Sequence, residues 1–268
     1  MRRIALYSDI HGNTNALEAV LKHIDEIRPD ERYCLGDLVG YGPDPSGVIE
    51  MVRSSGVPVI RGNYDQGVGD RSGACGCYYA TDQAKSDGAA SYVFTEQAVG
   101  DADAKWLVSL PAEIRLDEAG VRILLTHGSP RRINEYLMPD RGEGQLARLA
   151  RDADADVVCC GHVHIPYHRS FRADPGDDAS PIVHYVNSGS VGKPKDGDPR
   201  ACWVELLIGP ATEVRAAAPH DNYAAPAGAT DTWVGLVIRR VPYDVESVAD
   251  AVLAAGLPPT LAGALRTA

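Results

Sequence analysis

Residues 4–13, near the start of the chain, read Ile4-Ala5-Leu6-Tyr7-Ser8-Asp9-Ile10-His11-Gly12-Asn13. Its first four residues are apolar or aromatic and predict a short buried strand. Apolar residues from Leu17 to Ile27 then recur at the spacing of an amphipathic helix. The polar residues between them therefore follow the end of a strand, which is where binding sites gather in parallel β-α-β units.

The same alternation continues along the chain. Strands are expected over 33–35, 57–60, 121–125, 157–160, 182–186, 202–208 and 233–241. Helices are expected over 46–53, 143–151 and 245–255. Because 166–172 and 182–186 flank a polar turn, they predict an antiparallel hairpin and hence a mixed sheet.

Two segments interrupt this alternation. Residues 65–110 pass from Gly-rich to Ala-rich sequence and predict a helical insertion beside the site. Residues 209–231 are rich in Ala, Pro, Gly and Asp and predict a loop.

Composition restricts the class of protein. The chain has 268 residues, with 26 Lys and Arg against 37 Asp and Glu, so its formal charge is −11. This acidic excess argues against nonspecific binding to a nucleic-acid backbone, which requires a basic stripe. No apolar run approaches the roughly 18 residues of a membrane span, and the first apolar run is too short for a signal peptide. We therefore expect a cytoplasmic protein without a membrane partner.

The six cysteines do not have the spacing of a small secreted scaffold, so reduced thiols are expected. Cys75 and Cys77 are separated by one glycine, but two sulfurs without two obvious partners make a poor zinc motif. We expect both to be buried or idle thiols.

Seven side chains with oxygen or nitrogen donors follow the predicted strands: Asp9, His11, Asp37, Asn63, His127, His162 and His164. A neighbouring glycine at each of five positions lets the backbone turn tightly or approach closely. Residues two apart in an extended segment point the same way, so Asp9 with His11, and His162 with His164, are each expected to face one cavity. The set suits two divalent ions about 3.5 to 4 Å apart with a bridging carboxylate. The other histidines are expected on a helix surface, hairpin or loop: His23, His168, His184 and His220.

Five ordered motifs closely resemble those of the calcineurin-like metallophosphoesterase superfamily: Asp9-Ile10-His11, Gly36-Asp37, Gly62-Asn63, Thr126-His127-Gly128 and Gly161-His162-Val163-His164. The resemblance covers about residues 3–208, and residues 7–13 and 186–192 are similar to its small bacterial and archaeal phosphodiesterase-like branch. It implies an α/β fold, a four-layer α/β/β/α sandwich with two mixed β-sheets, here with a helical insertion. We expect one metallophosphoesterase domain over 1–268, with a helical cap at 65–110 and a C-terminal strand-helix extension at 232–268.

The resemblance also implies a ligand set. It places Asp9, His11 and His164 on one divalent transition-metal ion. It places Asn63, His127 and His162 on a second ion, with Asp37 bridging the two. Mn, Fe, Zn, Ni and Co all suit these nitrogen and oxygen donors. The implied reaction is hydrolysis of a phosphodiester or phosphoanhydride bond by a hydroxide that bridges both ions.

Three further residues are candidates for the chemistry. Many relatives have histidine after the Gly-Asn motif, whereas this chain has Tyr64, a weaker acid at neutral pH. Tyr64 is expected either to protonate the leaving group weakly or to form a wall of the pocket. Asn13 is expected to cap a helix or to face substrate. Arg131 is the favoured basic contact to phosphate because it is close to His127 in sequence.

The expected substrate is a small phosphorylated molecule, with nucleotides among the candidates. The alternatives are a phosphomonoesterase or protein phosphatase, a dinucleoside polyphosphate hydrolase, and a sensor that binds metal and a phosphorylated ligand without turnover. The complete set of seven donors favours an enzyme. The sequence carries no pattern that defines an oligomeric state.

Overall fold

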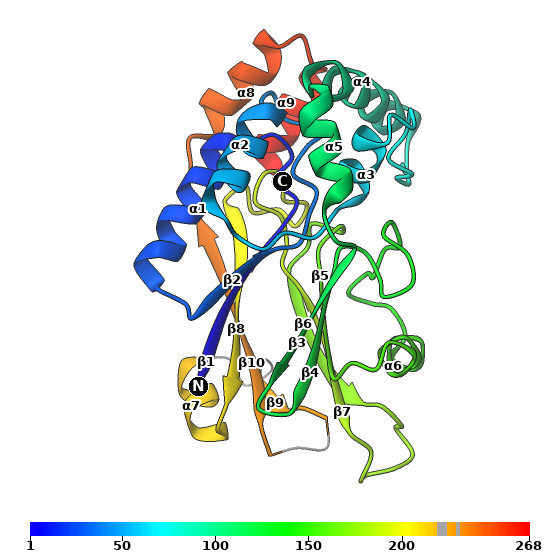
Figure 1. Ribbon diagram of the computed structural model, residues 1–268, viewed down its shortest axis with the longest axis vertical. Coiled ribbons are helices and arrows are strands. Elements are labelled where there is room, and N and C mark those ends of the chain that lie inside the picture. The colour runs from blue at the N-terminus through cyan, green and yellow to red at the C-terminus, as the bar shows by residue number, and fades with distance from the viewer. Residues whose placement is uncertain (219–223, 229–230) are drawn as a thin grey trace.

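The computed structural model describes residues 1–218, 224–228 and 231–268. Two five-stranded sheets face each other (Figure 1). The first sheet has the order β2 (Glu31–Cys34), β1 (Arg2–Tyr7), β8 (Ala201–Gly209), β10 (Trp233–Val241) and β9 (Ala224–Pro226). The second has the order β3 (Glu113–Glu118), β4 (Val121–Thr126), β5 (Val157–Cys160), β7 (Ile182–Asn187) and β6 (Tyr167–Arg172).

Each sheet combines parallel and antiparallel neighbours. β1 pairs in parallel with β2 and antiparallel with β8. β5 pairs in parallel with β4 and β7, whereas β6 and β7 form the predicted antiparallel hairpin. The prediction of two mixed sheets is confirmed.

Apolar side chains fill the space between the sheets. Ile4 and Leu6 of β1 belong to one buried cluster with Leu125 of β4 and Val157 of β5. The alternate side chains of β1, such as Tyr7, point to the helices on the other face of the sheet. Both faces of this strand are covered, which explains its continuous apolar run.

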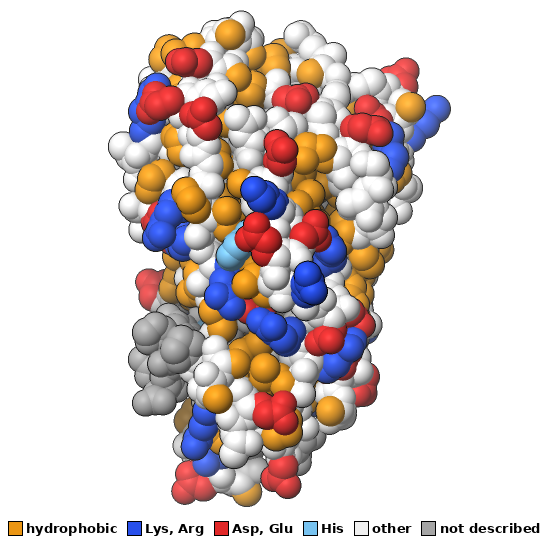
Figure 2. Space-filling model, turned by 90° about the vertical axis from the view of Figure 1, so that its left-hand side faces the viewer, with side chains coloured by type: hydrophobic (Ala, Val, Ile, Leu, Met, Phe, Trp, Pro, Cys, Tyr) orange, Lys and Arg blue, Asp and Glu red, His pale blue; other side chains and the backbone are white. Residues whose placement is uncertain are grey.

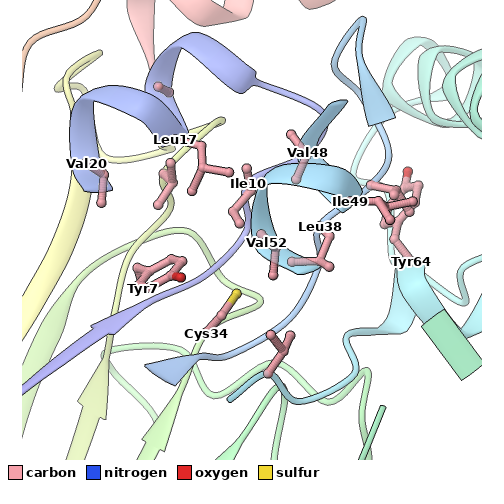
Figure 3. Packing of buried hydrophobic residues seen from close by; sticks show 14 of the residues in the cluster. Tyr7, Ile10, Leu17, Val20, Cys34, Leu38, Val48, Ile49, Val52 and Tyr64 are labelled. Carbon is pink, nitrogen blue, oxygen red and sulfur yellow. The ribbon is translucent and has the colours of Figure 1, made fainter. Parts of the chain in front are cut away.

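Helices cover the outer faces and complete the four layers. Figure 3 shows side chains of α1 (Thr14–Ile27) and α2 (Pro45–Ser55), among them Leu17 and Val52, above Tyr7 and Cys34 of the first sheet. Leu146 of α6 (Glu143–Asp152) belongs to the cluster that covers the second sheet. The predicted α/β/β/α sandwich is therefore confirmed.

The remaining large helices gather at one end of the molecule (Figure 1). They are α3 (Asn63–Gly69), α4 (Asp82–Ala98), α5 (Asp101–Ser109), α8 (Val245–Ala254) and α9 (Pro259–Thr267). The predicted helical insertion is thus present. Phe94 of α4 packs against the apolar cluster of α8 and α9, so the insertion and the C-terminal helices meet.

Several local predictions are wrong. Residues 57–60 form one isolated bridge, between Cys34 and Val59, and no strand. Pro58 has no N–H to donate to a ladder. The segment 209–231 contains α7 (Ala211–Ala217) and β9, because Val214 buries its side chain against the first sheet. The edge strand β3 and helix α9 were not predicted from the sequence. In β3, exposed and half-buried residues alternate, so the strand lacks a buried apolar run.

The expectation of reduced cysteines is wrong for one pair, since the structure joins Cys75 and Cys77 in a disulfide. Gly76 between them has φ +69°, a left-handed turn that glycine adopts readily and that brings their Cα atoms to 5.5 Å. The four free cysteines are buried: Cys34, Cys159, Cys160 and Cys202.

The surface carries charges of both signs. Figure 2 shows basic and acidic side chains interspersed on the face that it presents. Within the described ranges, no helix has both the length and the apolar character needed to cross a membrane.

Candidate metal centre

The seven predicted donor side chains converge at one end of the facing sheets. Their loops follow β1, β2, β4 and β5, and Asn63 begins α3. All seven are buried, with none more than 4% exposed. The sequence therefore brings together seven polar side chains in a region from which water is largely excluded.

Six of these side chains form two clusters. Donor atoms of Asp9, His11 and His164 lie within 4.8 Å of one another. Donor atoms of Asp37, His127 and His162 do the same. Asn63 joins the second cluster, because its Oδ1 lies 3.0 Å from Nε2 of His127. The grouping follows the two sets that the resemblance implies.

Asp37 lies between the clusters. Its Oδ2 is 3.4 Å from Nε2 of His127 in one cluster and 3.8 Å from Nε2 of His11 in the other. Its Oδ1 accepts the backbone N–H of Tyr64 at 2.8 Å. One carboxylate oxygen is thus fixed by the main chain, and the other faces both clusters.

The first cluster contains two imidazole nitrogens that face each other. Nε2 of His11 lies 3.1 Å from Nε2 of His164. The opposite nitrogens, both Nδ1, bond to the carbonyl oxygens of Val39 at 2.9 Å and Lys193 at 2.6 Å. A carbonyl oxygen only accepts, so each Nδ1 carries the proton and each neutral ring presents a lone pair at Nε2. Two facing lone pairs repel each other unless a proton or a metal cation lies between them.

The second cluster repeats this pattern. Nδ1 of His127 donates to the carbonyl oxygen of Leu35 at 2.8 Å, which turns its Nε2 toward Oδ1 of Asn63. The Asn63 amide nitrogen donates to the carbonyl oxygen of Cys75 at 3.0 Å, so the oxygen faces inward. Nε2 of His162 is buried without a hydrogen-bond partner, which is rare for a buried polar atom. This donor set fits bound metal ions.

The pKa values of the histidines reflect the same crowding. Burial and the nearby His127 lower the pKa of His162 to about 4. Burial also lowers the pKa of His11 and of His164, which keeps these rings neutral. For His127, burial opposes the charge, but the Asp37 carboxylate raises its pKa to about 10. Three neutral rings beside two carboxylates suit metal ligation, which requires deprotonated imidazole.

The backbone at the site is not extended, which corrects the geometry that we predicted. Left-handed φ values occur at five donors: Asp9 (53°), His11 (51°), Asp37 (54°), His162 (67°) and His164 (64°). Such values are uncommon outside glycine and concentrate at functional sites. His162 and His164 face different clusters, in agreement with the ligand sets that the resemblance implies.

Two glycines permit the close approach of the loops. A Cβ atom on Gly62 would lie 2.1 Å from Oδ1 of Asp37, and one on Gly161 would lie 2.5 Å from Oδ2 of Asp9. Either side chain would displace a carboxylate. The absence of a side chain at these two positions is therefore needed for the arrangement.

Sequence reasoning missed the role of Asp65. Its buried carboxylate accepts the backbone N–H groups of Asp37 at 2.8 Å, Leu38 at 2.9 Å and Gly62 at 2.9 Å. It thereby ties the Asp37 loop to the turn that precedes Asn63. The sequence offered one indication of this role. Asp65 stands at the third position of α3, which is where a capping box has its acidic residue.

Tyr64 is buried beside the first cluster. Its ring makes edge contacts with His11 and lies 5.0 Å from the ring of Tyr41. The hydroxyl is buried without a hydrogen-bond partner, and burial raises its pKa well above the usual value near 10. These contacts favour a role for Tyr64 as a wall of the pocket over a role as a general acid. Both roles stay predictions.

The two predicted substrate contacts are engaged elsewhere. Oδ1 of Asn13 accepts the N–H of Ala16 at 3.0 Å and caps α1, while its Nδ2 donates to Gly192. The Arg131 guanidinium pairs with Glu135 at 2.6 Å and lines a separate hollow of about 390 Å³. The helix cap is confirmed, and substrate binding by Asn13 or Arg131 stays a prediction.

Three of the other histidines have clear structural partners. Nε1 of Trp203 donates to His23 at 3.1 Å. His168 and His184 stack within the β6–β7 hairpin, with rings 5.2 Å apart. His220 lies outside the described residues.

Comparisons with known proteins agree with this geometry. Residues 2–207 match the calcineurin-like phosphoesterase superfamily domain. The chain is 30% identical over 214 residues to the uncharacterized protein MJ0912 of Methanocaldococcus jannaschii, covering 75% of this chain and 80% of that protein. The chain therefore belongs to the calcineurin-like phosphoesterase superfamily.

Solved structures show the same similarity. A metallophosphoesterase from Sphaerobacter thermophilus is 26% identical with a TM-score of 0.68, covering 99% of this chain and 98% of that one. The hypothetical protein PH1004 from Pyrococcus horikoshii OT3 is 21% identical with a TM-score of 0.73 and the same coverage, which shows the fold alone. Within the superfamily, the protein is a metal-dependent phosphoesterase.

Proposed function

We propose that the protein hydrolyses phosphodiester or phosphoanhydride bonds in a small phosphorylated substrate, at a centre that holds two divalent transition-metal ions. The observation that carries this proposal is the position of Asp37, whose Oδ2 faces His127 at 3.4 Å and His11 at 3.8 Å. A carboxylate between two sets of donors is what a dinuclear centre requires.

The residues divide into two ligand sets. Asp9, His11 and His164 would hold one ion, and Asn63, His127 and His162 the other. Asp37 would contact both. When bound, the ions would supply Lewis-acid stabilisation of phosphate oxygens and activation of water near neutral pH. Nitrogen and oxygen donors without thiolate suit Mn, Fe, Zn, Ni and Co.

The chain itself orients these groups. Carbonyl oxygens hold the Nδ1 atoms of His11, His127 and His164, which fixes each ring with its Nε2 toward the centre. Asp65 fixes the main chain at Asp37. The side chains are therefore held in place before substrate binds.

The environment of Tyr64 supports phosphoanhydride and aryl phosphodiester substrates. A buried tyrosine with a raised pKa donates a proton poorly. Phosphate and aryl oxide groups leave without that proton, whereas a simple alkoxide benefits from an acid. The chain is therefore better suited to good leaving groups.

The test is release of p-nitrophenol from bis(p-nitrophenyl) phosphate by protein that has been treated with a chelator. We expect little activity until Mn²⁺ or another transition-metal ion is added. Parallel assays with p-nitrophenyl phosphate distinguish a diesterase from a monoesterase. Absence of turnover with every metal, despite metal binding, would favour the alternative of a sensor.

A further inference from the structure

A cleft of about 760 Å³ opens beside the two clusters. Three parts of the chain line it: the loops of the metal centre, the insertion and helix α9. Its polar and aromatic lining includes Tyr41, Tyr78, Tyr79, Tyr136, Lys193 and Lys195. The volume is typical of a site for a small molecule.

The cleft adjoins both clusters. The ring of Tyr41 lies 5.0 Å from the ring of His11, and the ring of Tyr136 lies 4.1 Å from that of His162. The wall of the cleft is therefore one aromatic ring away from each cluster. A molecule in this cleft would lie next to the proposed metal ions.

Two lysines lie on the same wall. Lys193 offers its carbonyl oxygen to Nδ1 of His164, and the N–H of Lys195 donates to the carbonyl oxygen of His164. Nζ of Lys193 lies 4.9 Å from the centre of the Tyr41 ring. Within the described part of the chain, neither ammonium group forms an ion pair with a carboxylate, so both remain available to phosphate oxygens.

The mouth of the cleft exposes large apolar surface. Tyr78 is 76% exposed and Met138 is 39% exposed, and both line the cleft. Exposed aromatic and apolar side chains at the rim of a concave surface are typical of ligand binding. Flat aromatic faces also match the face of a planar ring.

The insertion and the C-terminal segment build this cleft together. Tyr78 and Tyr79 come from the loop between α3 and α4, and Leu261 comes from α9. Asp87 of α4 accepts a hydrogen bond from Thr260 of α9 at 2.7 Å, which joins the two parts. This arrangement is consistent with the insertion acting as a cap over the substrate.

We propose that the substrate is a nucleotide, whose base stacks on tyrosines of this cleft while its phosphates pass Lys193 and Lys195 toward the metal centre. The proposal rests on the function proposed above and names the class of substrate. A phosphate compound without an aromatic ring would leave the tyrosines unused.

The binding test compares AMP with ribose 5-phosphate, which carries the same phosphate and sugar without the base. Calorimetry on the metal-loaded protein should give at least tenfold tighter binding of AMP. Tyr78→Ala and Tyr79→Leu should each weaken the binding of AMP at least fivefold. Both should leave the affinity for ribose 5-phosphate unchanged. Val93→Ala, at an apolar residue of α4 that is 52% exposed outside the cleft, is the matched control and should change neither.

A kinetic test uses two phosphoanhydrides, ATP and inorganic tripolyphosphate. We expect kcat/KM to favour ATP, and Tyr78→Ala to reduce that preference through KM. Equal affinity for AMP and ribose 5-phosphate, or unchanged AMP binding in both tyrosine variants, would overturn the nucleotide proposal even if bis(p-nitrophenyl) phosphate is hydrolysed. Preferential AMP binding without hydrolysis of any phosphodiester or anhydride would instead refute the proposed function.

Discussion

Nε2 of His11 and Nε2 of His164 lie 3.1 Å apart, although the two residues are 153 positions apart in the chain. Each ring is held by a backbone carbonyl at its other nitrogen, so two lone pairs face each other. This arrangement is stable only with a positive charge between the rings. A metal ion held by these two rings and Asp9 would supply that charge.

We predict close to two transition-metal ions per chain, because a second set of donors surrounds His127 and Asn63. Elemental analysis of purified protein measures the stoichiometry. Chelation should also lower the melting temperature, since ligands that bind only the folded state stabilise it. One ion per chain, with His127 and His162 unliganded in a crystal structure, would contradict the dinuclear centre.

Asp65→Asn should reduce metal content, activity and stability together. The substitution replaces one carboxylate oxygen by an NH2 donor. That donor faces either the N–H of Leu38, at the position of Oδ1, or the N–H groups of Asp37 and Gly62, at the position of Oδ2. A buried donor left without an acceptor costs about 1 to 3 kcal/mol, so urea unfolding should show a loss of at least about 1 kcal/mol.

Asp156→Asn is the control for this variant. Asp156 is also buried, and it accepts the backbone N–H of Arg122 at 3.0 Å in the second sheet. We expect it to lower stability while leaving metal content and kcat unchanged. Normal metal content and activity in Asp65→Asn would show that Asp65 does not position the centre.

Tyr64→Phe should have little effect on activated substrates, because the hydroxyl has no hydrogen-bond partner. Tyr64→His should raise kcat/KM for alkyl esters such as glycerol phosphate if the new imidazole reaches the leaving oxygen, since general acids contribute about 10² to 10⁴-fold. Steady-state kinetics on matched aryl and alkyl esters measure both effects. A large loss in Tyr64→Phe confined to alkyl substrates would identify Tyr64 as the acid.

The free energy of unfolding should decrease as the pH falls, because the buried His184 must take up a proton on unfolding. His184 is not one of the predicted donors. Burial lowers its pKa to about 4, compared with about 6.5 in an unfolded chain. Between these values the unfolded state binds more protons, so stability rises with pH and is lost as the pH falls from about 6.5 toward 4.

His184→Gln should remove this dependence, which amounts to at most about 1.4 kcal/mol per pH unit. Urea unfolding of both proteins at pH 7 and pH 5 measures the difference. An identical decrease in stability for wild type and variant would show that His184 does not contribute.

The donors could be predicted from sequence because they cluster after short apolar runs, and glycine adjoins the set at five positions, as Gly12 does beside His11 and Gly128 beside His127. Their backbone could not, because the left-handed φ at Asp9 and His162 depends on contacts between loops distant in the chain. The role of Asp65 could not be predicted because its hydrogen-bond partners, the N–H groups of Asp37 and Leu38, come from another loop.

The cleft could not be predicted from sequence patterns either. Residues 65–110 were predicted to be helical from composition, but nothing local indicated that α4 would meet α9. The bond between Asp87 and Thr260 joins residues 173 positions apart. Local patterns predict elements, whereas the surface between elements depends on how they pack.

Asp37 is proposed to contact both metal ions, so turnover of bis(p-nitrophenyl) phosphate by Asp37→Asn with added metal is the decisive measurement. We predict a loss of at least about a hundredfold, greater than that in His164→Asn, which removes a ligand of one ion. Circular dichroism should stay near wild type, because the change preserves shape. Turnover within about tenfold of wild type, corresponding to roughly 1.4 kcal/mol of barrier, in a normally folded and metal-loaded variant would show that Asp37 does not contact both ions.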